Sequence, residues 1–273
     1  MSGAFTVVSR GWSTSLQDHG RPGLAHLGVP RSGPVDRPLA DLVSRAVGNP
    51  PGTVLIETAG GLALRAEWPF VVASSHTGTP VSLQPGEVLH VPPGHRNLEY
   101  VAVRGGILEH PVLGSCSHDT LSGLGPPPVD TGARYEVGPD PGTPVNVDVA
   151  PLGDGPDRIR LWPGPRLDHL LDGSLDSLTE HPWEVTDRWS RVGVRLRGVP
   201  PPRRLDVHLP SEGLVLGAVQ LPPSGEPVVM LADHPTTGGY PVVAVVHRDD
   251  LAPLARRRPG STLRFVAADP DRG

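Results

Sequence analysis

The chain has no lysine and a single cysteine, Cys116, among its 273 residues, so all 24 of its cationic side chains are arginine. Without lysine, the chain cannot use a Schiff-base mechanism or the lysine of a phosphate-binding loop. A single cysteine cannot form an intramolecular disulfide or a cysteine-rich zinc site. These absences remove several common classes of enzyme.

Long apolar segments are also missing, because no run approaches the roughly 18 residues needed to cross a bilayer. The first six residues lack the basic and apolar blocks of a signal peptide. A net charge of −5 and a pI of about 6.2 give no general attraction to nucleic acid or anionic lipid. We therefore expect a cytoplasmic protein with neither nucleic-acid nor membrane partners.

Glycine and proline, in contrast, are abundant, with 34 and 35 residues. Both interrupt helices, so long helices are not expected. Hydrophobic residues make up 37% of the chain and charged residues 19%, a balance that argues against disorder. The composition predicts a mainly β protein with few short helices.

Short β-type segments recur along the chain, each bounded by Gly, Pro, Asp or Ser, as is typical of barrel or sandwich strands. Strands are predicted at Phe5–Ser9, Val54–Glu57, Leu62–Arg65, Phe70–Ala73, Glu87–Val91, Leu98–Val103, Val145–Val149, Arg158–Trp162, Val192–Leu196, Val228–Leu231, Val242–Val246 and Thr262–Val266. The Pro- and Gly-rich stretch 138–156 separates two β-rich halves. We place these halves at residues 1–155 and 156–273.

One segment has clear helical spacing. Its apolar positions are Leu39, Leu42, Val43 and Ala46. Asp36 is suited to cap its N-terminus, and Gly48 to end it. Weaker helical patterns lie at 167–178 and 249–256.

Two polar, glycine-containing segments in the first half are candidates for chemistry. In residues 17–36, Asp18 and Arg21 suit an ion pair or the binding of a polar substrate, and glycines let the backbone approach a ligand. In residues 114–120, Ser117, His118 and Asp119 are adjacent in sequence, whereas the members of a catalytic triad converge from separate segments. The hydroxyl groups therefore either satisfy a tight loop or bind a substrate. Cys116 is either a nucleophile beside His118 or, more commonly for such a residue, a buried thiol.

Two further candidate segments lie in the second half, at residues 211–225 and 233–241. The run Thr-Thr-Gly-Gly-Tyr at 236–240 offers hydroxyl groups and flexible backbone that suit a small amide or carboxylate, although a hairpin with a packed tyrosine has the same pattern. None of the 12 histidines has His-x-His or His-Glu-x-x-His spacing, so no metal site is predicted. The chain also has no glycine-rich nucleotide loop of a standard type.

Five motifs, in order, resemble the family of the 5-oxoprolinase C subunit, also called the KipA or biotin-dependent carboxyltransferase family and similar to subunit 2 of allophanate hydrolase. They are SLQDHGRPGLAHLGVPRSGPVD (15–36), VGNPPGTVLIETAGG (47–61), VLGSCSHDTLSGLG (112–125), SEGLVLGAVQLPPSGEPVVMLADHPTTGGYP (211–241) and RRPGSTLRF (257–265). The resemblance implies a cyclophilin-like β-barrel architecture, with the barrel in the C-terminal half.

The same resemblance implies a function within a complex. The partners would be a KipI-like B subunit and a LamB/YcsF-like A subunit, and the reaction would be ATP-dependent opening of 5-oxoproline to glutamate. ATP would be bound at the level of the complex, since this chain has no nucleotide loop. Relatives in urea carboxylase instead transfer a carboxyl group from carboxybiotin, so biotin on a partner and a urea-like amide substrate form the alternative.

The polar positions that match the family motifs define the predicted site. The expected catalytic residues are Asp18, Arg21, Glu212 and Asp233. Arg21 would position an anionic or carbonyl group and Asp18 would orient Arg21, while Glu212 or Asp233 would act as acid or base. The expected substrate-binding residues are Gln17, Ser32, Asp36, Ser117, Gln220, Thr237, Gly238, Gly239 and Tyr240, with Thr237 and Tyr240 as hydrogen-bond donors.

Three departures from the resemblance leave a further hypothesis open. Relatives often carry Arg at the position of Cys116 and Lys at the position of Val242, and a Gly-Gly-containing loop where this chain has Pro126–Pro128. Loss of a cation that contacts the substrate would alter specificity or weaken activity. The third hypothesis is therefore a divergent, non-catalytic regulatory partner of a KipI-like protein.

Overall fold

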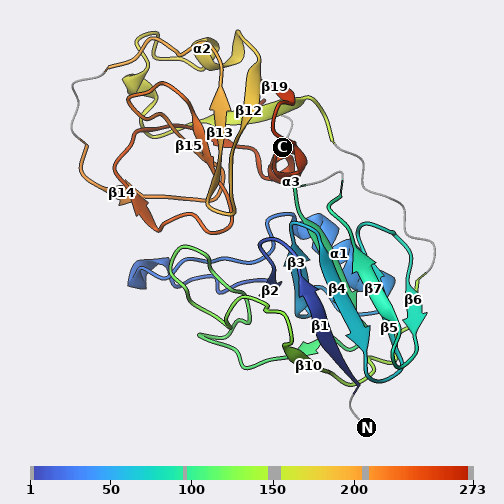
Figure 1. Cartoon of the computed structure of the whole chain (residues 1–273). Helices are drawn as coiled ribbons and strands as arrows, with labels where there is room; N and C mark the ends of the chain where they lie inside the picture. Colours follow the sequence, from blue (N-terminus) through green and yellow to red (C-terminus); the bar gives the residue numbers. More distant parts are fainter. Residues whose placement is uncertain (1–2, 95–96, 147–154, 205–208, 270–273) are drawn as a thin grey trace. The chain divides into compact units, whose positions relative to one another are not determined.

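The computed structural model describes residues 3–94, 97–146, 155–204 and 209–269. The chain forms two compact units, one made of residues 1–22 and 32–153 and the other of residues 23–31 and 154–273. Both units consist mainly of strands with few short helices (Figure 1), which confirms the predicted fold class. Most of the predicted strand Val145–Val149 lies outside the described residues.

The first unit contains two five-stranded antiparallel sheets. One has the order β7 (Val88–Val91), β4 (Leu62–Ala66), β1 (Ala4–Arg10), β10 (Arg134–Val137), β9 (Ile107–Leu108). The other has the order β2 (Ser15–Gln17), β3 (Leu55–Thr58), β8 (Glu99–Val103), β5 (Phe70–Ser74), β6 (Val81–Leu83). Strand alternation sends one face of each sheet into a shared apolar core.

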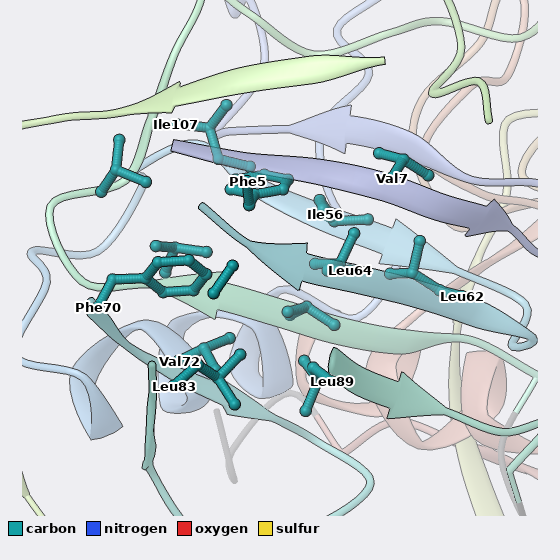
Figure 2. Close-up of a cluster of buried hydrophobic side chains, with 14 of the residues drawn as sticks. Phe5, Val7, Ile56, Leu62, Leu64, Phe70, Val72, Leu83, Leu89 and Ile107 are labelled. Carbon is teal, nitrogen blue, oxygen red and sulfur yellow. The ribbon is translucent and has the colours of Figure 1, made fainter. Parts of the chain in front are cut away.

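That core is formed by side chains from both sheets, including Phe5 and Leu64 from the first and Ile56 and Val72 from the second (Figure 2). The Phe5 ring is fully buried, and its centroid lies 6.0 Å from that of Phe70. Full burial of one such side chain contributes about 1.5–3 kcal/mol. The core therefore holds the strand β2, from which the candidate site begins, in a fixed position.

Helix α1 (Arg37–Ala46) covers the other face of the second sheet, where it packs on Tyr100 and neighbouring residues. Its start agrees with the sequence, because the Asp36 carboxylate accepts a hydrogen bond from Leu39 N at 3.1 Å. Its end agrees as well, since Gly48 follows with φ +78°, and a Cβ there would lie 2.9 Å from the carbonyl oxygen of Pro144.

The second unit is a closed barrel of seven strands. Their order is β11 (Arg158–Pro163), β18 (Val242–Val246), β15 (Ala218–Gln220), β16 (Val228–Met230), β13 (Gly193–Arg197), β12 (Trp183–Trp189), β19 (Thr262–Ala267), and β19 pairs in parallel with β11 to close it. Trp183 is fully buried and its Nε1 donates to the carbonyl oxygen of Leu178 at 2.8 Å. A separate two-stranded antiparallel sheet is formed by β14 (Glu212–Gly213) and β17 (Thr237–Gly238).

The predicted strands within the described residues match observed strands to within one residue at each end. The missed strands are mostly two to four residues long, too short to show alternation. The longer β12 was missed because its later positions, Asp187 and Arg188, are charged and exposed. The predicted helix 167–178 is instead a 3₁₀ turn, Leu167–His169, and the short α2 (Asp176–Thr179), interrupted by Gly173 at φ +62°.

The predicted helical segment 249–256 forms a 3₁₀ turn, Arg248–Asp250, followed by α3 (Leu251–Arg256). Asp250 is buried and binds Arg160 of β11 through three bonds: the backbone N at 2.7 Å, Nε at 2.9 Å and Nη2 at 2.8 Å. Burial alone would raise the pKa of Asp250, but the hydrogen bonds and charge of Arg160 outweigh burial and lower it below 3.8.

We expect Asp250→Asn to lower the free energy of unfolding by about 1 kcal/mol at pH 7, an effect limited by the solvent-screened Arg160 side chain. A lowered carboxyl pKa stabilises the fold above the unfolded pKa, and this contribution disappears as pH falls through the folded pKa. The difference from the wild type should therefore shrink as pH falls below about 4. Urea titrations across this pH range measure it, and a difference that is constant with pH would contradict the assignment.

Candidate functional site

The Asp18 carboxylate organises the loop 115–117 of the first unit. Its oxygens accept from the Cys116 N–H at 2.6 Å, the Ser117 hydroxyl at 2.7 Å and the Gly20 N–H at 2.8 Å, and also from the Ser115 hydroxyl. Charge-assisted hydrogen bonds of this kind are the stronger ones in proteins. Asp18 therefore joins two motifs that are about a hundred residues apart in sequence.

Arg21 supports the same loop from a different side. Its side chain is 2% exposed, and its Nε and Nη2 donate to the carbonyl oxygens of Val112, Ser115 and Ser117 at 3.3, 3.4 and 2.5 Å. Its Nη1 is buried with no hydrogen-bond partner in the described part of the chain. The prediction that Asp18 orients Arg21 is wrong, because each binds the loop 112–117 separately and no ion pair joins them.

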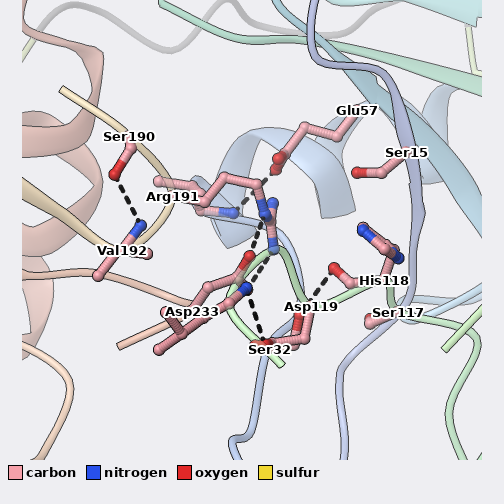
Figure 3. A network of polar contacts seen from close by, with 12 residues as sticks. Ser15, Ser32, Glu57, Ser117, His118, Asp119, Ser190, Arg191, Val192 and Asp233 are labelled. Carbon is pink, nitrogen blue, oxygen red and sulfur yellow. Dashed lines mark hydrogen bonds and ion pairs between the residues drawn. The ribbon is translucent and has the colours of Figure 1, made fainter. Parts of the chain in front are cut away.

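Gln17, Ser32 and His118 converge on one backbone carbonyl. The oxygen of His118 accepts from Gln17 Nε2 at 3.0 Å and from the Ser32 hydroxyl at 3.1 Å. Gln17 Nε2 also donates to Ser15 Oγ at 2.9 Å, whereas its buried Oε1 has no partner among the described residues. Figure 3 shows Ser15, Ser32, Ser117 and His118 grouped in this part of the first unit. The structure therefore brings predicted binding residues from both motifs together.

A second buried group lies at the N-terminus of α1. Glu57 Oε2 accepts from the Tyr100 hydroxyl at 2.8 Å and from the Val35 N–H at 3.0 Å, and the Asp36 N–H donates to the Tyr100 oxygen at 2.8 Å. Burial, together with the charges of Glu57 and Asp36, raises the pKa of Tyr100 well above 10. Tyr100 therefore remains a neutral donor, and the Asp36 carboxylate caps the helix.

Cys116 is buried, with 5% of its surface exposed. Desolvation, followed by the negative charges of Asp18 and Glu109, raises its thiol pKa to about 11. At neutral pH the side chain is a thiol, which is a weak nucleophile. Of the two interpretations left open by the sequence, nucleophile or buried thiol, Cys116 therefore fits the buried thiol.

We expect native Cys116 to react slowly with iodoacetamide at pH 7.5, with a rate that rises with pH toward 11, whereas the unfolded chain should titrate near 8.5. Quantifying alkylation by mass spectrometry against pH measures this difference. Cys116→Ala should keep the loop intact, since Asp18 binds the backbone N–H of residue 116. Rapid modification at pH 7.5 would contradict the buried-thiol assignment.

Asp233 forms a buried ion pair with Arg191 in the second unit. The guanidinium donates through Nε at 2.7 Å and Nη2 at 2.8 Å, and the two side chains are 0% and 3% exposed (Figure 3). The Asp233 N–H also donates to the Arg191 carbonyl oxygen at 2.9 Å, which ties the chain after β16 to the β12–β13 turn. The carboxylate predicted as an acid or base is thus held by a bidentate partner.

The two-stranded sheet β14–β17 carries three predicted residues of the second unit, Glu212, Thr237 and Gly238. Glu212 pairs with Arg166, whose Nε lies 3.0 Å from Glu212 Oε2, and both side chains are about one-third exposed. In register, Glu212 faces Gly238 and Gly213 faces Thr237. A Cβ at Gly238 would lie 2.6 Å from Gln220 Nε2, so a larger residue there would displace the Gln220 side chain.

Four other positions singled out in the second unit, Gln220, Gly239, Tyr240 and Val242, differ in their burial and contacts. Gln220 is buried and donates to the Tyr240 carbonyl oxygen at 3.1 Å, while the Tyr240 side chain is 52% exposed. A Cβ at Gly239 would meet nothing within 4 Å. Val242 packs in a small apolar cluster with Leu214, so its side chain is part of a hydrophobic core.

Neither a metal centre nor a membrane span is found within the described ranges. Among these residues, no three His, Cys, Asp or Glu side chains are arranged to hold a metal ion. No helix there is long and apolar enough to traverse a bilayer.

Comparison with known proteins identifies the family. The carboxyltransferase domain, subdomain A and B, matches residues 27–267. The chain belongs to this carboxyltransferase-domain family. The C subunit of 5-oxoprolinase from Escherichia coli (strain K12) is 31% identical over 279 residues, which cover 95% of this chain and 90% of that protein. The urea amidolyase of Saccharomyces cerevisiae is 28% identical over 311 residues, covering 96% of this chain but 16% of that protein.

Solved structures of carboxyltransferase-domain proteins agree with this assignment. The crystal structure of TTHA0988 superposes with a TM-score of 0.85 and 34% identity, covering 97% of this chain and 56% of that one. The Kluyveromyces lactis urea amidolyase gives a TM-score of 0.82 at 25% identity, covering 97% of this chain and 19% of that one. The chain therefore spans about half of the first structure and a fifth of the second, and the resemblance drawn from the sequence motifs is confirmed.

Sequence reasoning missed the partners of several site residues. Arg166, Arg191 and Tyr100 hold Glu212, Asp233 and Glu57 respectively. No local sequence pattern predicts which arginine pairs with a given carboxylate, since the chain has 24 arginines. The one available signal was at Tyr100, which lies in a predicted, largely apolar strand, because a buried tyrosine hydroxyl needs a partner.

Proposed function

We propose that this carboxyltransferase-domain chain is the C subunit of an ATP-dependent 5-oxoprolinase complex, which opens 5-oxoproline to glutamate together with its A and B subunits. The supporting observation is the length-matched similarity to the C subunit of 5-oxoprolinase from E. coli, which the chain covers over 90% of its length. The urea amidolyase of S. cerevisiae is matched over only 16% of its length, as one part of a larger protein.

The residues of the first unit supply groups that suit a small amide with a carboxylate. Gln17 Oε1 is an acceptor for an amide N–H, and Arg21 Nη1 is a donor for an oxygen, and both are buried without a partner in the described chain. In the second unit, Thr237 and Tyr240 are the proposed hydrogen-bond donors, and Glu212 and Asp233 are the proposed proton-transfer carboxylates, each held by an arginine. ATP is proposed to bind at the level of the complex.

Biotin-dependent carboxyl transfer to urea or a related amide is the second candidate. The matching family is described as a carboxyltransferase domain, and the superposition with a urea amidolyase at a TM-score of 0.82 favours it. In that case the biotin would be carried by a partner. A regulatory, non-catalytic role with a KipI-like protein is the outcome expected if neither substrate is turned over.

The test combines this chain with purified A and B subunits from the same genome. We expect ATP hydrolysis and glutamate release that depend on 5-oxoproline and on the presence of this chain. Turnover that is unchanged when the chain is omitted would falsify the proposal. A parallel reaction with urea and a biotinylated carboxylase partner separates the two candidates, because only the second consumes bicarbonate.

A further inference from the structure

A hydrogen bond to a backbone carbonyl oxygen determines the tautomer of the neutral His118 ring. Its Nδ1 lies 2.9 Å from the carbonyl oxygen of Pro126, and a carbonyl oxygen can only accept a hydrogen bond. Nδ1 of the neutral ring therefore carries the hydrogen, and Nε2 has a free lone pair. No hydrogen bond to Nε2 occurs within the described part of the chain.

The backbone around His118 fixes the position of the ring. The His118 N–H donates to the Leu16 carbonyl oxygen at 3.0 Å, and its own carbonyl oxygen accepts from Gln17 and Ser32. Gly125 lets the following turn close on this loop, because a Cβ there would lie 2.1 Å from the Ser117 oxygen and 3.1 Å from His118 Cα. This close approach brings the Pro126 carbonyl to the ring. His118 is 8% exposed, so the site is largely desolvated.

A second acceptor belongs to Gln17, whose side chain binds the backbone of this histidine. The Gln17 side chain is fully buried, and while its Nε2 holds the His118 carbonyl, its Oε1 has no partner among the described residues. An unsatisfied buried acceptor costs about 1–3 kcal/mol, so a bound N–H group would stabilise it. Two acceptor lone pairs, one on the His118 ring and one on a glutamine held by the His118 backbone, suit a ligand that donates N–H bonds, such as a lactam or a urea-like amide.

We propose that His118 Nε2 accepts the amide N–H proton of the substrate, an inference that rests on the proposed function. In the 5-oxoprolinase reaction, the terminal phosphoryl group of ATP moves to the lactam oxygen and ADP leaves. The N–H bond breaks, its electron pair forms the C=N bond of the imidate, and the proton moves to Nε2. Carboxyl transfer to an amide nitrogen also removes an N–H proton, so the same histidine serves either candidate.

The test uses two variants that each imitate one ring nitrogen, in the complex with the A and B subunits. The amide NH₂ of His118→Asn can still donate to Pro126, but nothing replaces Nε2, whereas His118→Gln places an amide near Nε2 and leaves the Pro126 carbonyl without its donor. General base catalysis contributes about 10²–10⁴-fold, so we expect kcat to fall by about 10²-fold or more in both variants, with KM changing far less. Added imidazole should partly restore His118→Ala. His90→Asn, at an exposed position on β7, is the matched control and should behave as the wild type.

A second measurement does not depend on turnover. In long-range ¹H–¹⁵N spectra of the complex, the His118 signals, assigned by their loss in His118→Asn, should show the Nδ1–H tautomer, and Nε2 should shift when 5-oxoproline is added. Wild-type kcat in His118→Asn, or an unshifted Nε2 resonance, would overturn the role of His118 while leaving the proposed function intact. An inactive wild-type complex in which Nε2 shifts would instead overturn the proposed function and support the contact.

Discussion

Asp18→Ala is expected to destabilise the first unit by about 3 kcal/mol and to reduce kcat/KM of the assembled complex by about 10²-fold or more. The variant removes the acceptor for the Gly20 and Cys116 N–H groups and for two serine hydroxyls. Each buried donor left without a partner costs about 1–3 kcal/mol. Displacement of the 115–118 loop by even 1 Å is sufficient for a rate loss of this size.

Thermal unfolding and steady-state kinetics measure the two effects of Asp18→Ala. Asp18→Asn has nearly the same shape but replaces one oxygen by an NH₂ group, which cannot accept, so an intermediate loss is expected. Asp130→Ala is the matched control, because Asp130 is exposed and lies 3.6 Å from an exposed Arg10. It should change stability by less than about 0.5 kcal/mol. Equal behaviour of the Asp18 and Asp130 variants would show that the loop does not depend on Asp18.

Asp233→Ala is expected to lower the stability of the second unit by about 3–5 kcal/mol, the cost found when one partner of a buried ion pair is removed. The change takes the bidentate carboxylate from Arg191, whose side chain is 3% exposed, and loosens the connection between the β12–β13 turn and the chain after β16. Loss of activity would follow from this structural effect even if Asp233 never transfers a proton.

Unfolding of the Asp233→Ala variant in guanidinium chloride measures the loss of stability. Two further variants serve as controls for this measurement. Glu184→Ala breaks the exposed pair with Arg197 and should cost no more than about 1 kcal/mol. Joint replacement, Arg191→Met with Asp233→Leu, removes both charges and should recover much of the stability lost in Asp233→Ala. If the double variant regains stability but not activity, the carboxylate has a direct role in the reaction. An Asp233→Ala chain as stable as the wild type would contradict the buried-pair assignment.

The fold was predictable wherever neighbours in the chain determine structure. Asp36 and Gly48 bracket α1, because capping and left-handed backbone depend on residues within one turn. The alternating apolar residues of β1 and the continuous apolar run of β18 likewise predict strands. Strands as short as β14 and β17 escaped recognition, since two residues contain no period.

The sequence motifs yield a set of candidate site residues but not the contacts that these residues make. Gln17, Ser32 and Ser117 were chosen from motifs, and the structure brings them together around the loop 115–118. The expected Asp18–Arg21 pair does not form, because serine hydroxyls and a backbone N–H from residues nearly a hundred positions away satisfy Asp18. The roles assigned to Glu212 and Asp233 remain predictions.

The sequence by itself determined that the chain is mainly β, where its single α-helix of more than two turns within the described residues lies, and which family it resembles. It also determined, through the absence of lysine and the single cysteine, which chemistries are impossible. The tertiary structure alone decided that residues 23–31 belong with the second unit, that Asp18 and Arg21 each hold the same loop, and that the His118 ring presents Nε2. The reason is physical: propensities and caps act within a few residues, whereas a buried polar atom takes whatever partner the packed core brings near it.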